Sequence, residues 1–300
     1  MKILVFGSGG VGGYYGARLQ QAGHEVVFVA RGAHAAAMRE KGLRIQSALG
    51  DAMLPVKVAE KPEPADFAVV AVKLWDTEIA AQALAQVPPG AAVSLQNGVD
   101  KDEVLAEALG AEKVIGGVTY IAAVIAAPGV IAMTGRMARV TLGELKGGSS
   151  ERVDRLAQAF REAGVEVKVS EDVRRATWEK FCFLTALSGL TSLTRKPIGA
   201  IRENAATRSF LIDALHEAAQ VARAEGATLP ESFEEQTLSQ FDSLAPNMMS
   251  SMSQDLLRGS RLELPWLSGA VVRRAAKHGI GVPAHRGIHA ALVLHEKGSA

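Results

Sequence analysis

KILVFGSGGVG, residues 2–12, decides the fold of the first half of this 300-residue chain. The run KILVF at residues 2–6 predicts a buried strand, and residues 11–22 then show a helical pattern that ends at Gly23. Between them, Gly7, Gly9 and Gly12 have the spacing G-x-G-x-x-G. This spacing between a strand and a helix is typical of a loop that binds the pyrophosphate of a dinucleotide.

Each glycine of this loop has a physical role. Gly7 permits a tight turn, Gly9 removes a Cβ so that the backbone can approach a pyrophosphate, and Gly12 lets the helix pack closely on the strand. The helix N-terminus offers free N–H groups and the positive end of its dipole to phosphates. The alternative is a tight turn that binds nothing. The predicted cofactor-binding loop is Gly7, Ser8, Gly9, Gly10, Val11 and Gly12.

Strand and helix patterns alternate over the first 170 residues, which predicts a parallel sheet with crossover helices. Residues 118–142 break this alternation with β-forming residues around a Pro-Gly turn, and we expect antiparallel strands at the sheet edge. From residue 171 onward the patterns are long and helical. We therefore predict an α/β fold with an N-terminal Rossmann-type domain, residues 1–170, and an all-α substrate domain, residues 171–300.

The end of the second predicted strand, residues 25–30, distinguishes between the two nicotinamide cofactors. An acid there would bind the ribose 2′-hydroxyl of NAD, but the chain reads Val29-Ala30-Arg31 with no acid in reach. Arg31 suits the 2′-phosphate of NADP, because a guanidinium can grip a phosphate through two hydrogen bonds. Lys73 and Asn97 follow later strands at the edge where ligands bind. Solvated cations and a turn-forming Asn-Gly pair are the alternatives.

The first predicted helix of the second domain carries a candidate for proton transfer, Lys180. Partial desolvation in an apolar helix lowers the pKa of an amine and suits it to this role. A lysine that merely extends its ammonium to solvent is the alternative. Helical spacing places on one stripe Thr177, Lys180, Leu184, Ser188 and Thr191. Glu263 precedes another predicted helix, and its alternative role is that of a capping acid.

Composition excludes several classes of partner. The net charge of +1 and the 5% aromatic content argue against nucleic acid, and no apolar run is long enough for a membrane span. We expect a cytoplasmic protein with no metal site, whose single cysteine, Cys182, is an inert core thiol. The apolar C-terminal helices could bury their faces internally or in a homodimer.

The chain resembles the ketopantoate reductase (2-dehydropantoate 2-reductase) family over essentially its full length. The resemblance implies NADPH as cofactor and a small-molecule 2-oxo acid as substrate, with reduction of 2-dehydropantoate to pantoate in pantothenate biosynthesis as the first candidate reaction. The segments that carry it are residues 7–12, Arg31, Val72-Lys73, Gln96-Asn97-Gly98, Trp178-Glu179-Lys180, residues 251–255, Glu263 and residues 273–283.

The resemblance also implies roles for individual residues. Lys180 matches the family's catalytic lysine, which protonates the carbonyl oxygen as hydride reaches carbon 2, and Glu263 matches the acid that holds the substrate hydroxyl. Arg31 and Lys73 match residues on the adenosine phosphate side, and Asn97 matches the asparagine near nicotinamide and substrate. The substrate-binding set implied by these matches is Asn97, Lys180, Leu184, Ser188, Ser251 and Glu263.

The substrate positions depart from the family pattern. The family has asparagines four and eight residues after its lysine, where this chain has Leu184 and Ser188, and Pro265 and Ser268 also differ. Leu184 cannot donate a hydrogen bond, so a paralogue that reduces a different, less polar 2-oxo acid or ketone is an alternative. A third hypothesis is a nucleotide-sensing protein that has lost catalysis. The presence of both Lys180 and Glu263 argues against it.

Overall fold

The computed structural model describes residues 1–299, which divide into two compact units. The first unit comprises Met1–Asn97 and Lys101–Ala176, and the second comprises Gly98–Asp100 and the chain from Thr177 onward. The change at Thr177 lies within the helix that follows the predicted boundary near residue 170. No pattern in the sequence predicted that residues 98–100 leave the first unit.

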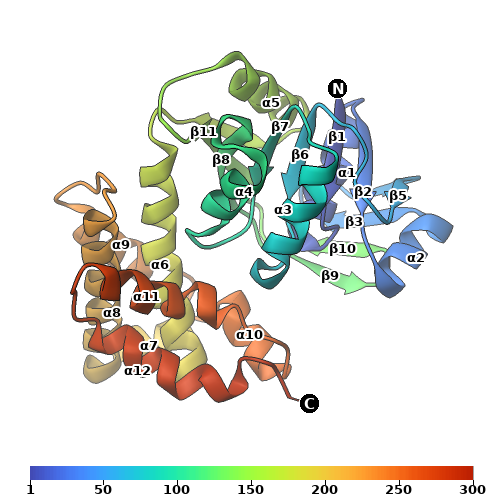
Figure 1. The fold of residues 1–300 in the computed structure, drawn as a ribbon. Helices are drawn as coiled ribbons and strands as arrows, with labels where there is room; N and C mark the ends of the chain where they lie inside the picture. The colour runs from blue at the N-terminus through green and yellow to red at the C-terminus, as the bar shows by residue number, and fades with distance from the viewer. Residues whose placement is uncertain (300) are drawn as a thin grey trace. The chain divides into compact units, whose positions relative to one another are not determined.

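An eight-stranded sheet forms the centre of the first unit, in the order β12-β11-β8-β7-β6-β1-β2-β5 (Figure 1). The strands from β5 to β8 in this order are parallel, β11 pairs antiparallel with β8, and β12 is parallel to β11. The predicted parallel sheet is thereby confirmed. The strands are β1 (Lys2–Phe6), β2 (Glu25–Val29), β5 (Lys57–Ala59), β6 (Phe67–Val70), β7 (Ala91–Ser94), β8 (Val114–Tyr120), β11 (Arg139–Glu144) and β12 (Glu166–Val169).

Helices cover both faces of this sheet, because alternate residues of each central strand enter different cores. In β1, Ile3 and Val5 pack in one cluster with α1 and α5, whereas Leu4 packs in another with α3 and α4. Burial on both sides explains why these strands are apolar throughout. The helices of this unit are α1 (Gly10–Gln21), α2 (Gly32–Lys41), α3 (Thr77–Gln86), α4 (Lys101–Leu109) and α5 (Glu151–Glu162).

A second sheet corrects the expectation for residues 118–142. Only β8 and β11 of that region pair antiparallel in the main sheet, while β9 and β10 belong to a separate sheet of order β4-β3-β10-β9. The reason is the parallel pairing of β10 with β3, a strand far away in sequence. The four strands are β3 (Leu43–Ser47), β4 (Ala52–Leu54), β9 (Ala123–Ala127) and β10 (Val130–Met133).

The second unit is helical throughout its described residues, as predicted. Trp178, Phe181, Cys182 and Leu187 all enter its core, and burial raises the pKa of the Cys182 thiol. Within residues 1–299, no helix is both long and apolar enough to cross a membrane. The helices are α6 (Val173–Thr194), α7 (Ile198–Glu203), α8 (Ala205–Ala224), α9 (Phe233–Ser243), α10 (Ser251–Leu257), α11 (Ser268–Lys277) and α12 (Pro283–Leu292).

A buried histidine connects three of these helices. The Nε2 atom of His285 in α12 lies 2.9 Å from the carbonyl oxygen of Ala214 in α8. A carbonyl oxygen only accepts, so Nε2 carries the proton and Nδ1 accepts from the hydroxyl of Ser268, 3.2 Å away at the start of α11. Complete burial lowers the pKa of His285 from 6.5 to about 4, against the effect of the Ala214 hydrogen bond.

This histidine predicts a loss of stability in acid. The unfolded chain takes up a proton below pH 6.5 and the folded protein resists it down to about pH 4, so about 3 kcal/mol of unfolding free energy is lost across this window. We expect His285→Gln to be less stable at neutral pH but to lose less stability on acidification. Denaturant unfolding at a series of pH values measures both. Exposed His295→Gln should follow the unchanged protein, and parallel curves for all three proteins would contradict the assignment.

Candidate active site

The carboxyl ends of β1, β2 and β6 meet at one edge of the main sheet. Phe6, the last residue of β1, pairs with Val29 of β2 on one side and with Val70 of β6 on the other. The chain after β1 continues to β2, whereas β6 lies on the opposite side, so the strand order reverses here. Open α/β sheets bind ligands at such a point, outside the carboxyl ends of the strands.

Packing within the chain accounts for most glycines of the loop after β1. Gly7 has φ +100, and a Cβ there would lie 2.7 Å from the backbone nitrogen of Val72. A Cβ on Gly12 would collide with the carbonyl oxygen of Gly7, and one on Gly10 with that of Ala123. Any side chain at these positions would therefore separate α1 from the strands beside it.

Gly9 is different, because the packing of the chain does not require a glycine there. Its φ of −65 suits any residue, and no atom of the described chain lies within 4 Å of a Cβ built on it. Gly9 is the N-cap of α1, whose first N–H groups and dipole favour an anion. A dinucleotide pyrophosphate fits this position, since its close approach would give a reason for the missing side chain.

His34 in α2 holds this loop and was missed in the sequence. Its Nδ1 accepts the N–H of Gly129 at 3.0 Å, so its Nε2 donates to the carbonyl oxygen of Ser8 at 2.9 Å. Burial lowers the pKa of His34, against the effect of the Ser8 hydrogen bond, which keeps this arrangement neutral. A lone histidine in a helix carries no signal of such a role, because both partners come from other elements.

The predicted phosphate-binding cation Arg31 has an acidic partner. Its Nη2 lies 2.8 Å from Oδ2 of Asp76, and 78% of the Arg31 side chain is exposed. The expectation that no acid is in reach is therefore wrong. Asp76 belongs to the turn after β6, and β6 and β2 flank β1 on its two sides, so the carboxylate arrives from a different βα unit. Lys73, in the same turn, places Nζ 5.7 Å from the ring centre of Trp75.

Asn97 follows β7 directly after a residue that ties two strand ends together. The Gln96 amide nitrogen donates to the carbonyl oxygen of Val72 at 3.0 Å and to the hydroxyl of Thr77 at 2.8 Å. The Ser94 hydroxyl donates to its amide oxygen at 2.9 Å. Buried Gln96 thus fixes the end of β7 against the segment that carries Lys73, and with it the start of the Asn97 segment.

The predicted stripe of α6 belongs to the second unit and changes in exposure along its length. Lys180 and Leu184 are half-buried, whereas Ser188 and Thr191 are fully buried. The accessible part of the stripe therefore ends at Leu184. The hydroxyl oxygens of Thr191 and Ser250 are 2.9 Å apart, which joins the stripe to the start of α10, where Ser251 is exposed.

Three buried hydroxyls on α6 have unused hydrogen-bonding capacity. Thr185, Ser188 and Ser192 are completely buried, and within residues 1–299 none of their hydroxyl oxygens has a hydrogen-bond partner. Their spacing of three and four residues places them on one side of the helix. Buried polar groups usually have a partner, which can be an ordered water.

Glu263 lies at the start of a short turn, residues 264–266, and is buried. Its backbone carbonyl accepts the N–H of Trp266 at 3.0 Å, while its side chain makes no capping hydrogen bond. Its carboxylate therefore does not cap this turn through a hydrogen bond. Ser268, one of the departures from the family pattern, has its hydroxyl engaged by His285 in the core.

Known proteins match the chain along almost all of its length. Residues 3–147 match the family model "Ketopantoate reductase PanE/ApbA", and residues 172–296 match the model of its C-terminal part. The chain belongs to the ketopantoate reductase family. A 2-dehydropantoate 2-reductase of Halobacterium salinarum is 37% identical, with 95% of this chain and 96% of the relative covered. The chain is accordingly an oxidoreductase of the 2-dehydropantoate 2-reductase type.

Solved structures agree with this ketopantoate reductase fold. A PanE/ApbA family ketopantoate reductase from Ralstonia eutropha superposes with a TM-score of 0.91 at 34% identity, covering 99% of this chain and 98% of that one. D-mandelate dehydrogenase, solved with NADH and anilino(oxo)acetate, shares the fold with a TM-score of 0.89 at 22% identity, covering 99% and 98%. Membership of this reductase family implies a nicotinamide cofactor.

The contrast between Gly9 and its neighbours predicts different effects of the same substitution. Gly9→Ala should weaken NADPH binding by about ten-fold or more, because its methyl group would displace the pyrophosphate, while unfolding free energy changes by only about 1 kcal/mol. Gly10→Ala should destabilise the fold by about 1–3 kcal/mol, because its Cβ collides with backbone. Fluorescence titration with NADPH and denaturant unfolding measure the two quantities.

Gly281→Ala is the matched control for Gly9. No described atom lies within 4 Å of a Cβ at Gly281 either, but that residue belongs to the helical unit and not to the loop. It should leave both affinity and stability nearly unchanged. Equal NADPH affinity in the Gly9→Ala and Gly281→Ala proteins would remove the argument for a pyrophosphate at Gly9.

Proposed function

We propose that this member of the ketopantoate reductase family reduces a 2-oxo acid with NADPH, and that 2-dehydropantoate, which gives pantoate for pantothenate biosynthesis, is its first candidate substrate. The observation that supports this most directly is the loop at Gly9, the position of the loop where packing within the chain does not require the missing side chain. When bound, NADPH supplies the hydride that adds to carbon 2 of the acid.

Lys180 is the proposed general acid. As carbon 2 gains the hydride, negative charge develops on the carbonyl oxygen, and an ammonium beside it stabilises this charge and delivers the proton that completes the hydroxyl. Its half-buried position at the accessible end of the α6 stripe suits this role. Glu263 is proposed to hold the hydroxyl that forms, and Ser251 and Asn97 to bind the substrate.

Leu184 supports a second candidate, reduction of a less polar 2-oxo acid or ketone. The accessible stripe of α6 presents an apolar side chain one turn after Lys180, where an amide would favour a polar substrate. The D-mandelate dehydrogenase structure shows that a protein with this fold binds a 2-oxo acid with an aromatic substituent. The same acid–base chemistry serves both candidates, which differ only in the group next to the carbonyl.

A panel of 2-oxo acids tests the proposal and separates the two candidates. With NADPH in excess, steady-state rates on 2-dehydropantoate should be compared with those on acids bearing aliphatic and aromatic substituents. Lys180→Ala should reduce turnover of the best substrate by at least about 10²-fold and leave NADPH affinity nearly unchanged. Fast turnover of an aromatic acid beside negligible turnover of 2-dehydropantoate would favour the second candidate.

Two outcomes of this panel would count against catalysis of this kind. NADPH binding without oxidation on any carbonyl would instead support a nucleotide-sensing protein. Unchanged turnover in Lys180→Ala would exclude Lys180 as the acid. The exposed Lys196→Ala variant, two residues after the end of α6, is the control for loss of a lysine outside the proposed site and should keep full activity.

For the cofactor, we propose a preference for NADPH that Arg31 and Lys73 create and Asp76 limits. The ion pair with Asp76 offsets part of the Arg31 charge, and the carboxylate would lie near a phosphate bound by that guanidinium. Two like unit charges about 4 Å apart repel by about 1 kcal/mol in water, or about five-fold in affinity. The preference should therefore be smaller than an unpaired arginine would give.

Opposite effects are expected at Arg31 and Asp76. Arg31→Ala should weaken NADPH by about ten-fold or more and NADH by much less, since a charge-assisted hydrogen bond contributes about 1.5–3 kcal/mol. Asp76→Asn should tighten NADPH by about five-fold with little change for NADH. Calorimetric titration with both cofactors, and with 2′,5′-ADP, gives the ratios.

Arg39→Ala serves as the control for these two variants. It breaks another exposed arginine–carboxylate pair of the same unit, with Glu60, and should not alter the ratio of the two affinities. An equal loss of NADPH and NADH affinity in Arg31→Ala would contradict the assignment to the 2′-phosphate. Weaker NADPH binding in Asp76→Asn would mean that Asp76 chiefly orients Arg31.

A further inference from the structure

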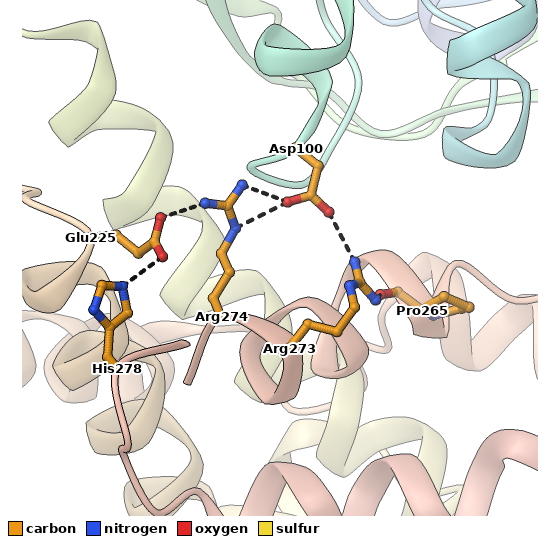
Figure 2. Close-up of polar contacts among 6 residues, drawn as sticks. All are labelled: Asp100, Glu225, Pro265, Arg273, Arg274 and His278. Carbon is orange, nitrogen blue, oxygen red and sulfur yellow. Dashed lines mark hydrogen bonds and ion pairs between the residues drawn. The ribbon is translucent and has the colours of Figure 1, made fainter. Parts of the chain in front are cut away.

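Two consecutive arginines of α11 bind one carboxylate on a loop far away in sequence (Figure 2). Arg274 donates to Oδ1 of Asp100 from Nε at 3.0 Å and from Nη2 at 2.7 Å, and Arg273 donates to Oδ2 at 3.0 Å. Arg274 also pairs with Glu225 at the end of α8, and Glu225 lies 2.9 Å from Nε2 of His278. We call Asp100, Glu225, Arg273, Arg274 and His278 the arginine cluster.

The centre of the arginine cluster is shielded from water. Only 7% of the Arg274 side chain and 11% of the Glu225 side chain are exposed, whereas Arg273 is half open to solvent. Burial alone would raise the pKa of Glu225, but the hydrogen bond from His278 and the charge of Arg274 hold it below its usual value. Paired in this way, a buried guanidinium has one favoured geometry, which makes it suited to fixing the positions of other groups.

Three contacts of the arginine cluster lead to the proposed catalytic segments. The Arg274 guanidinium lies 5.7 Å from the ring centre of Trp178, two residues before Lys180. Arg273 donates to the carbonyl oxygen of Pro265 at 2.6 Å, two residues after Glu263. The partner of both arginines, Asp100, follows Asn97 by three residues.

The loop that carries Asp100 packs with the helical unit by an apolar contact as well. Val99 is buried in the core cluster of that unit, and residues 98–100 belong to it as a whole. Because three residues span at most about 11 Å, an anchored Asp100 restricts the space open to Asn97. Asn97 is therefore constrained from Gln96 on one side and from Asp100 on the other.

We propose that Arg274 and Asp100 are positioning residues of the reductase reaction. In this role they contact neither the substrate nor the nicotinamide. Arg274 sets the orientation of the α6 turn that carries Lys180, its neighbour Arg273 secures the turn that begins at Glu263, and Asp100 anchors the loop that follows Asn97. This inference rests on the function proposed above, because it assumes that Lys180, Glu263 and Asn97 act on the substrate.

Asp100→Asn, Arg274→Gln and the double variant test the proposal. Each single variant should lower kcat by about ten-fold or more with less than about two-fold change in NADPH affinity, as expected for misplaced catalytic groups. The double variant should lower kcat by less than the product of the two single effects, because both changes break the contact between Arg274 and Asp100. Arg274→Lys, which keeps the charge but not the two-pronged geometry, should lie between Arg274→Gln and the unchanged enzyme.

Two measurements separate misplacement from simple loss of folded protein. Partial unfolding lowers apparent kcat without changing the primary isotope effect from deuterated NADPH, whereas misplaced groups slow the chemical step and raise that effect. Hydrogen exchange measures how well ordered the two segments are, and it does not require that the enzyme turns over a substrate. It should accelerate in peptides that span residues 95–103 and 174–184 of both single variants.

Arg208→Ala is the matched control, since it removes a two-pronged arginine–aspartate pair, with Asp242, elsewhere in the helical unit. It should leave kcat, isotope effect and exchange in both segments unchanged. Unchanged exchange in Asp100→Asn and Arg274→Gln, or kcat within two-fold of the unchanged enzyme, would overturn the proposal. If the unchanged enzyme reduces no 2-oxo acid, the proposed function fails instead, and exchange alone then decides whether the cluster orders these segments.

Discussion

The close approach of α1 to the strands beside it is the constraint on which the α/β unit depends. A Cβ on Gly12 would collide with the loop, one on Gly16 with the ring of Phe28 in β2, and one on Gly10 with β9 of the second sheet. Glycines inside a helix cost about 1 kcal/mol each, but burial of Tyr14, Tyr15 and Leu19 contributes about 1.5–3 kcal/mol apiece. The packing therefore outweighs the poor helix propensity, and it directs the helix N-terminus to the end of β1.

Charged side chains fix the irregular segment between β7 and α4. The ladder between β7 and β8 ends at Val93 and Ile115, and the Lys101 ammonium then donates to the carbonyl oxygens of Ser94 at 3.2 Å and Gly117 at 3.0 Å. Asp102, 2.8 Å away, balances its charge. Lys101 is thus fixed in the first unit, while the preceding Asp100 is fixed by arginines in the second. Ion pairs, rather than strands or helices, determine this segment.

Features that depend on neighbours in sequence were predictable. The strand β1, the glycine loop, the helix after it and the buried face of α6 all follow from local spacing, and each lies within a few residues of its predicted place. Strands β3 and β4 were not recognised, because both are short and β3 gains its parallel partner from residues 130–133. The small sheet is a property of tertiary pairing that no window of sequence contains.

The same distinction explains which site residues could be found. Lys180 and Glu263 were recognisable through a resemblance spread over the whole chain, whereas His34 and Asp76 act through partners from other elements. Asp76 is the more instructive case, since an acid was sought at the end of β2 and came instead from the turn after β6. The sequence identified Arg31 as a cation but not the Asp76 carboxylate that pairs with it in the structure.

The residues that depart from the family pattern also differ from one another in their surroundings. Ser268 is committed to His285 and so belongs to the core, while Ser188 keeps an unpaired buried hydroxyl. Leu184 packs partly against the helical core and presents no polar group near Lys180. Proton transfer needs only the ammonium, but discrimination among acids depends on such neighbouring donors. The proposed reaction type therefore rests on residues that this chain retains, and the identity of the proposed substrate acid rests on the positions where it differs.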